Sequence, residues 1–167
     1  MDANVHAPNP DLGGRAAEPA EEGVNMIDPE DQDIRRGGFV VGGPRALLRL
    51  EALAALAGLA AWYQSASADW LMFAVLFLVP DLSMLGYLAG RRIGAVCYNA
   101  AHSYLGPIAL LAAAQVDPRL LPFGLIWAAH VAFDRALGYG LKYGTAFGDT
   151  HLGLVGKRKA ALAAAAA

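Results

Sequence analysis

Aspartate and histidine side chains occur inside otherwise apolar stretches of this 167-residue sequence. They are Asp81, His102, His130 and Asp134. His130 and Asp134 are four residues apart, so they share one face of a helix. A charged side chain at the centre of a membrane helix costs about 2.5–3.5 kcal/mol on insertion scales, so such residues usually face a partner, a cavity or a ligand. These four are therefore the candidate catalytic residues.

Three more polar residues occur near this depth and are candidate ligands or supporting groups. Asn99 precedes His102 by three residues and shares its helix face. Arg135 directly follows Asp134, and Glu51 lies in the first apolar stretch. At about 1.5 Å per residue, each predicted helix contributes a polar residue to one layer between a third and a half of the way into the membrane.

The segment over residues 138–153 is rich in glycine and aromatic residues and carries two further candidates, Asp149 and His151. Two interpretations of this segment are open. It folds back beneath the helices and closes the mouth of the polar layer, or it is an ordinary amphipathic loop at the membrane interface.

The residue types of the polar layer are those that bind divalent metal ions. Neutral imidazole and carboxylate groups from facing helices can surround such an ion, with His102, His130, Asp81 and Asp134 as its ligands. The sequence has no HExxH motif or other dedicated ligand spacing. A divalent metal is therefore one hypothesis among several, and the sequence names no other cofactor.

Two alternatives use the same residues without a metal. A buried carboxylate and an imidazole with separated pKa values can exchange protons with a bound molecule, as general acid–base catalysis or a proton relay. In a purely structural interpretation, Asp81 or Asp134 pairs with Arg135, while the histidines and Asn99 bond carbonyl groups that proline has freed. The sequence does not decide among these three interpretations.

The elements that must position these residues are four apolar stretches over residues 46–63, 70–89, 93–114 and 120–140. Each is near the ~20 residues that cross a hydrocarbon core about 30 Å thick. With 56% hydrophobic residues and a mean hydropathy of +0.37, the sequence predicts an all-α integral membrane protein. We expect a bundle of four transmembrane helices in antiparallel up-down order, with Pro80 and Pro107 interrupting the second and third.

The two ends of the chain differ from this membrane domain, which we assign to residues 45–157. Residues 1–38 are rich in acidic residues, proline and glycine, which predicts a disordered acidic tail. Residues 158–167 form an alanine-rich tail. Cys97 is the only cysteine, so an intrachain disulfide and a CxxC site are excluded.

The basic residues of the membrane domain predict its orientation. Most of them flank the start of the first stretch, the loop after the second and the end of the fourth. By the positive-inside rule, both termini lie in the cytoplasm and the protein is a multi-pass protein of the inner membrane. The expected partners are the lipid bilayer and either a second copy of the chain or a larger membrane complex, with no nucleic acid.

Several runs of residues resemble a known family. They cover residues 80–87, 98–102 and 130–143, together with the closing residues 150–153. The chain is similar, over about residues 47–157, to the small prokaryotic membrane family listed as domain of unknown function 4260. The resemblance implies no activity, but it places the following residues in the family pattern: Asp81, Asn99, His102, His130, Asp134, Arg135, Asp149 and His151.

The functional prediction from the sequence is a small membrane enzyme, or a ligand-binding or metal-binding protein, with a polar pocket that faces the cytoplasm. The alternatives are a transporter or channel-like element and an accessory subunit of a larger complex. The sequence shows no internal symmetry of the kind that inverted-repeat transporters have.

Overall fold

A computed structural model describes residues 38–156 together with Ala160 and Ala164. The predicted acidic tail up to residue 37 lies outside these residues, as does most of the predicted alanine-rich tail. The chain forms these elements in order: α2 (Gly42–Ala66), α3 (Trp70–Phe77), the 3-10 helix η1 (Val79–Ala89), α4 (Arg91–His102), α5 (Leu105–Ala113), the 3-10 helix η2 (Pro118–Leu120), α6 (Leu121–Leu137), β1 (Asp149–Thr150) and β2 (Gly153–Leu154).

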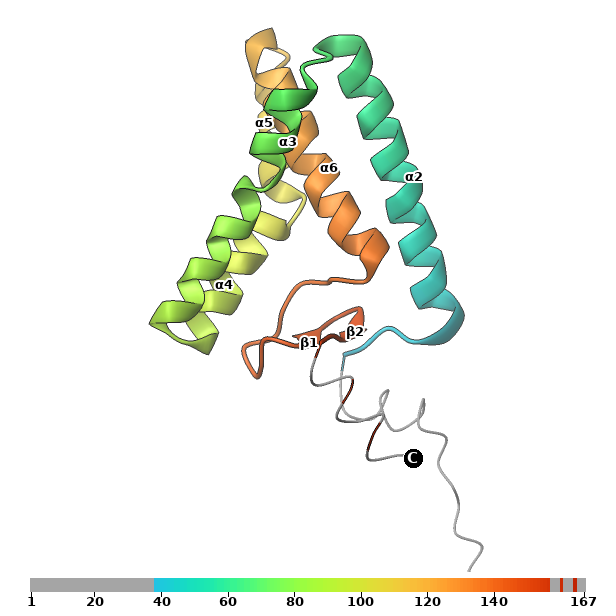
Figure 1. Cartoon of the computed structure of the whole chain (residues 1–167), viewed down its shortest axis with the longest axis vertical. Helices are drawn as coiled ribbons and strands as arrows, with labels where there is room; N and C mark the ends of the chain where they lie inside the picture. The colour runs from blue at the N-terminus through green and yellow to red at the C-terminus, as the bar shows by residue number, and fades with distance from the viewer. Residues whose placement is uncertain (1–37, 157–159, 161–163, 165–167) are drawn as a thin grey trace, which may run out of the picture.

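The protein is mainly helical, as the sequence predicts, and three of its helical segments are long and apolar enough to cross a membrane. They are Gly42–Ala66, Trp70–Ala89 and Pro118–Leu137. Figure 1 shows α2 leading away from the two short strands, and α3 with η1 returning toward that end of the molecule. The antiparallel order of four spans across a bilayer stays a prediction.

The third predicted span differs from a continuous helix because it consists of two shorter helices, α4 and α5. The helix ends at His102, and Ser103 has an extended backbone with ψ 153°. Pro107 lacks a backbone N–H and would clash with the carbonyl group four residues earlier, which is that of Ser103. The break therefore falls at the carbonyl that this proline frees.

The second span is also interrupted, at Pro80. α3 ends at Phe77, and the chain continues as the 3-10 helix η1 with the proline in its first turn. Without an N–H group, Pro80 cannot extend the α-helical hydrogen bonding of α3. Both breaks occur beside candidate site residues, because Asp81 follows Pro80 and His102 is the last residue of α4.

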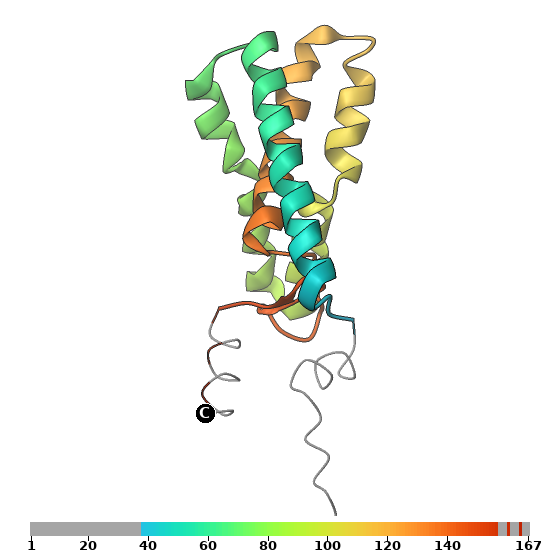
Figure 2. The same ribbon diagram turned by 90° about the vertical axis from the view of Figure 1, so that its right-hand side faces the viewer.

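Helix α6 is central to the packing and contacts α2, α3 and α5. Figures 1 and 2 show it running through the middle of the helices. An apolar core joins Tyr63, Leu125 and Ile126, against which side chains from α2, α3 and α5 pack. Large apolar side chains elsewhere on the helices are exposed, as expected for a surface covered by lipid.

Glycine lets η1 and α4 approach each other closely. A Cβ atom on Gly86 would lie 2.8 Å from Cβ of Cys97, and one on Gly94 would overlap the ring of Tyr87. This close contact fixes the position of Asp81 on η1 relative to the residues of α4.

The segment after α6 turns back beneath the helices, where Figure 2 shows the strands at one end of the molecule. β1 and β2 are antiparallel, with Asp149 opposite Leu154, and an isolated bridge joins Lys142 to Thr150. The backbone of Val40 donates a hydrogen bond of 2.9 Å to the carbonyl oxygen of His151, so the start of the described chain meets this segment.

Candidate functional site

Three helical segments bring Asp81, His102, His130 and Asp134 together. The Nε2 atom of His102 lies 3.1 Å from Nε2 of His130 and 3.4 Å from Oδ1 of Asp81. Oδ1 of Asp81 is 3.6 Å from Nε2 of His130, and Oδ2 of Asp134 is 3.6 Å from Nε2 of His102. We call these four residues the His–Asp cluster. It is the group that the sequence predicts as the candidate site.

The backbone fixes the orientation of the His102 ring. Its Nδ1 atom lies 2.9 Å from the carbonyl oxygen of Tyr98, one helical turn earlier. A carbonyl oxygen only accepts hydrogen bonds, so Nδ1 of a neutral ring carries the proton and Nε2 keeps its lone pair. The Tyr98 ring also stacks on His102 at 3.7 Å between centroids. The lone pair of His102 therefore points toward the other three members of the cluster.

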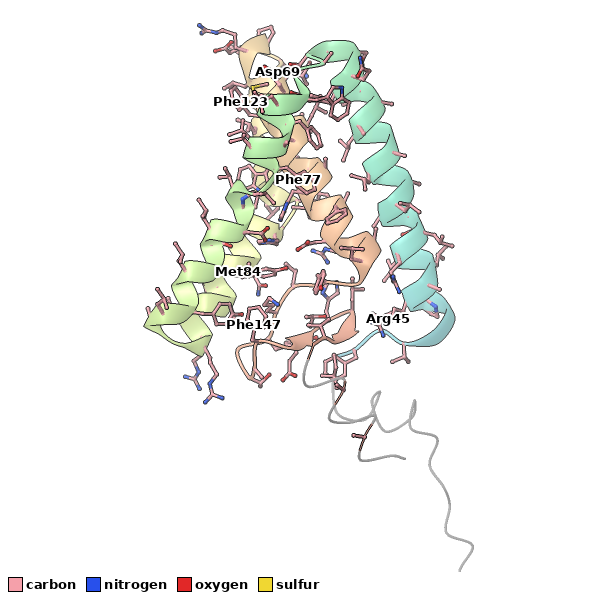
Figure 3. All side chains as sticks on the ribbon, in the orientation of Figure 1. Arg45, Asp69, Phe77, Met84, Phe123 and Phe147 are labelled. Carbon is pink, nitrogen blue, oxygen red and sulfur yellow. The ribbon has the colours of Figure 1, made fainter. Side chains whose placement is uncertain are left out.

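The His130 ring is the second buried imidazole of the cluster. It is 2% exposed and packs edge-on against Phe77, with 5.0 Å between the ring centroids. Its Nδ1 atom is buried and has no hydrogen-bond partner among the residues that the structure describes. Its Nε2 atom therefore makes the polar contacts of this side chain, and they all lie within the cluster. Figure 3 shows Phe77 partway along the helices, between the ends marked by Asp69 and Arg45.

The two carboxylates differ in their surroundings. The side chain of Asp81 is 36% exposed, whereas that of Asp134 is 15% exposed. Asp134 Oδ2 accepts a hydrogen bond of 2.8 Å from the Tyr98 hydroxyl group. Sequence reasoning missed Tyr98, although its position four residues before His102 places both on one helix face. The cluster thus has one partly exposed carboxylate, Asp81, and one more buried carboxylate, Asp134, which a hydrogen bond from Tyr98 orients.

The distances within the cluster fit a metal ion. The ligand atoms of Asp81, His102 and His130 all lie within 4.8 Å of one another, the one such group among the described residues. Two ligands at the usual ~2.0–2.2 Å from a tetrahedral ion lie about 3.3–3.5 Å apart. The three separations of 3.1, 3.4 and 3.6 Å lie in this range or within about 0.2 Å of it. Two imidazoles and a carboxylate also suit zinc and other first-row transition metals better than magnesium or calcium.

Arg135 lies behind the cluster and does not form the predicted pair with Asp81 or Asp134. Its Nη1 atom lies 2.7 Å from Nε2 of His151, and Nη2 donates to the carbonyl oxygen of His102 at 3.3 Å. The guanidinium group therefore joins the segment after α6 to the residue that ends α4.

Asn99 also binds the segment after α6 and does not join the cluster. Its Nδ2 atom donates to the carbonyl oxygen of Lys142 at 2.9 Å, and its Oδ1 atom accepts from the backbone N–H of Lys142 at 2.7 Å. A side-chain amide thus pairs with both backbone groups of one residue. We call Asn99, Arg135, Lys142 and His151 the tail clamp.

Lys142 is a further buried residue that sequence reasoning did not place near the site. It is 5% exposed, and its Nζ atom donates to the carbonyl oxygen of Phe147 at 3.0 Å. Nζ also lies over the rings of Tyr98 and Phe147, at 4.6 and 3.9 Å from their centroids. Burial lowers the pKa of Lys142 below its ordinary value. The sequence signal for this placement is weak, because a basic residue after a span predicts an exposed anchor.

The remaining predicted residues lie outside the cluster. Asp149 accepts a hydrogen bond of 2.6 Å from the hydroxyl group of Thr145, within the segment after α6. His151 Nδ1 accepts from the backbone N–H of Leu141 at 2.8 Å. Burial, followed by the charge of Arg135, lowers the pKa of His151. Glu51 is exposed on α2 and does not join the group of three ligands.

The comparison with known families gives one match. The model of a family described as "Domain of unknown function (DUF4260)" matches residues 45–155. No match is found among curated proteins. None is found among solved structures.

Proposed function

The chain belongs to the DUF4260 family, and we propose that it is an integral membrane metalloprotein in which Asp81, His102 and His130 bind one divalent transition-metal ion. The observation that carries the proposal is the convergence of their ligand atoms, spaced as the corners of a tetrahedral site are. Asp134 stands beside them as a fourth ligand or as a base next to the ion.

Electrostatics supports a bound cation at this position. Two carboxylates and two imidazoles meet where three helical segments of the protein pack together, and unpaired charge is costly there. A divalent ion balances the two negative charges of Asp81 and Asp134. It also gives both Nε2 lone pairs an acceptor, so the two rings need not share one proton across 3.1 Å.

The ligand set leaves coordination space, which is typical of catalytic sites rather than closed structural ones. A bound ion of this kind lowers the pKa of a coordinated water molecule toward neutrality. Asp134 is held by the Tyr98 hydroxyl group within 3.6 Å of His102 Nε2, where its carboxylate can accept a proton. We therefore propose a metal-dependent membrane enzyme, with Asp134 as general base.

The distribution of basic residues supports an orientation with both termini in the cytoplasm of a cell with an inner membrane. Arg91 donates to the carbonyl oxygen of Thr145 at 3.5 Å, and Arg45 packs beside Gly153, so these arginines lie at the same end as the strands. Positive charge at one end of a helical membrane protein favours the cytoplasmic side. A reporter fused at residue 1 that reads periplasmic would contradict this orientation.

Metal analysis of the purified protein tests the site. Full-length protein in mild detergent is supplied with zinc, iron(II) or manganese(II) in turn, and the bound ion is counted after removal of free metal. We expect about one ion per chain, with loss of the ion in His102→Ala and His130→Ala. Glu51→Gln and His151→Gln are matched controls that keep the ion. A wild-type protein that retains none of these ions would overturn the proposal.

A second candidate function is metal-free proton transfer. The 3.1 Å separation of the two Nε2 atoms also fits a hydrogen bond between the rings, with a proton on His130 Nε2. In that case Asp134, Tyr98 and the two histidines form a proton path. The same metal analysis separates the two functions, because a proton path needs no ion and survives chelation.

A further inference from the structure

An apolar cavity of about 300 Å³ lies beside the His–Asp cluster, and its walls come from the same three parts of the chain. η1 and α3, the α4–α5 pair, and α6 each contribute side chains. The lining residues are Leu76, Val79, Pro80, Ser83, Ala101, Leu110, Phe123, Ile126 and Trp127. The volume is at the lower end of the range for small-molecule sites, which is about 300–1,000 Å³.

Helix geometry places one end of this cavity next to the cluster. On α6, Ile126 and Trp127 precede His130 by four and three residues, so they share its face, one turn of about 5.4 Å away. Ala101 is the neighbour of His102, and Pro80 is the neighbour of Asp81. Phe123 lies a further turn along α6, and Figure 3 shows it toward the end of the molecule that is opposite the strands.

One polar atom in the cavity wall is without a partner. The hydroxyl oxygen of Ser83 is buried and makes no hydrogen bond with any residue that the structure describes. Ser83 lies two residues after Asp81 on η1, about 4 Å farther along the helix axis, so this part of the cavity wall is near the cluster. A buried hydroxyl group without a partner is destabilising, and a ligand oxygen at this end would give it a hydrogen-bond partner.

The surroundings of the cavity indicate what fills it. Val79 and Phe123 line it and are also among the exposed large apolar residues of segments that are candidate membrane spans. A cavity that opens on such a surface meets hydrocarbon chains before any water-soluble molecule. The cavity is apolar along most of its length and polar only at Ser83 and the adjoining cluster.

We propose that this cavity binds one hydrocarbon chain of a membrane lipid, with the oxygen-bearing end of that lipid directed toward Ser83 and the His–Asp cluster. The substrate class of the proposed metal site is then an acyl lipid that enters from the bilayer. The proposal that a hydrocarbon chain binds here depends on the cavity alone. The proposed position of the lipid's polar end depends on the proposed metal site.

A photoreactive fatty acid tests the inference. Full-length protein in phosphatidylcholine nanodiscs is labelled with a diazirine analogue of palmitic acid, with and without excess palmitic acid, and the labelled residues are mapped by mass spectrometry. We expect a competable label on residues that line the cavity. Ala101→Phe fills the cavity and reduces this label by about tenfold, whereas Ala100→Phe changes an exposed neighbour on α4 and leaves it unchanged.

A second pair of variants keeps the test valid if Ala101→Phe does not fold. Val79 lines the cavity but is 48% exposed, so Val79→Phe blocks the opening without overfilling the core. Its matched control is Leu78→Phe, at an exposed position that does not line the cavity. The inference would be overturned if each cavity variant were labelled as strongly as its control. A competable label that maps only to the exposed faces of the helices would also overturn it.

Metal content is measured on the same samples, so the two proposals fail separately. A protein that binds no ion but takes up a competable label in the cavity contradicts the metal site and supports the lipid chain. The opposite result is a protein that binds the ion through His102 and His130 but shows no competable label. It contradicts the proposal that the cavity binds a lipid chain and supports the metal site. Ser83→Ala reduces the competable label by about threefold if a lipid oxygen bonds this hydroxyl group.

Discussion

Two polar groups lie near each other in this protein, and they differ in how their hydrogen-bonding atoms are used. In the tail clamp, Asn99 meets both backbone groups of Lys142 at 2.7 and 2.9 Å, so its donors face acceptors. In the His–Asp cluster, the Nε2 atoms of His102 and His130 face each other at 3.1 Å. In the Asn99–Lys142 pair each donor meets an acceptor, which indicates a structural role. Two imidazole Nε2 atoms at 3.1 Å need a proton on one of them or a cation between them, which indicates a site for a cation or a proton.

The largest expected effect concerns the cluster itself. His130→Ala removes one of the three ligands that converge within 4.8 Å, and we expect metal affinity to fall by more than about 100-fold. Competition with a chelating indicator measures this affinity. Asn99→Ala, in the tail clamp, should change it much less. Equal losses in the two variants would mean that the clamp and the cluster act as one unit.

The next largest effect concerns the clamp. Asn99→Ala leaves the backbone N–H and carbonyl groups of Lys142 without their partners, which costs about 2–3 kcal/mol of folding stability. Trypsin cleaves after lysine, so the rate of cleavage at the buried Lys142 reports release of the segment. We expect faster cleavage than in Gln115→Ala, which changes an exposed amide. An unchanged rate would show that other contacts hold the segment.

Tyr98 contacts both groups, so its substitution sharpens the comparison. Tyr98→Phe removes the 2.8 Å hydrogen bond to Asp134 but keeps the ring over which Lys142 Nζ lies. Loss of an outer hydrogen bond of this kind typically lowers metal affinity by about 10-fold. We expect that loss with no faster cleavage at Lys142. Tyr139→Phe, at an exposed position, is the control.

The smallest effect is a pH dependence of the clamp. Burial and the charge of Arg135 lower the pKa of His151, so the folded protein resists protonation there. The unfolded chain protonates this residue near about pH 6.5. As pH falls through that value, only the unfolded state gains this proton, and stability decreases. Metal-free His151→Gln should therefore lose less Tm between about pH 7.5 and 5.5 than the metal-free wild type. Parallel Tm curves would contradict this.

The interruptions of the helices show how far sequence reasoning reaches. Pro80 and Pro107 predict interruptions of the second and third spans, and the chain breaks beside both. The sequence cannot show how complete each break is. The third span divides into two helices at Ser103, where the backbone is extended. Beside this break Trp127 of α6 donates to the carbonyl oxygen of Ala101 at 2.6 Å, a contact between helices that the sequence does not show.

The sequence by itself determined the helical membrane class, the family and the unusual polar residues, because hydropathy, proline and isolated charge are local properties of a chain. Only the tertiary structure separated these residues into a cluster and a clamp. Spacing along one helix shows which residues share a face, but it does not show which faces of different helices meet. Asn99 shares a helix face with His102, but it does not join the cluster. The segment after α6 folds back beneath the helices, and Asn99 hydrogen-bonds the backbone of Lys142 in that segment.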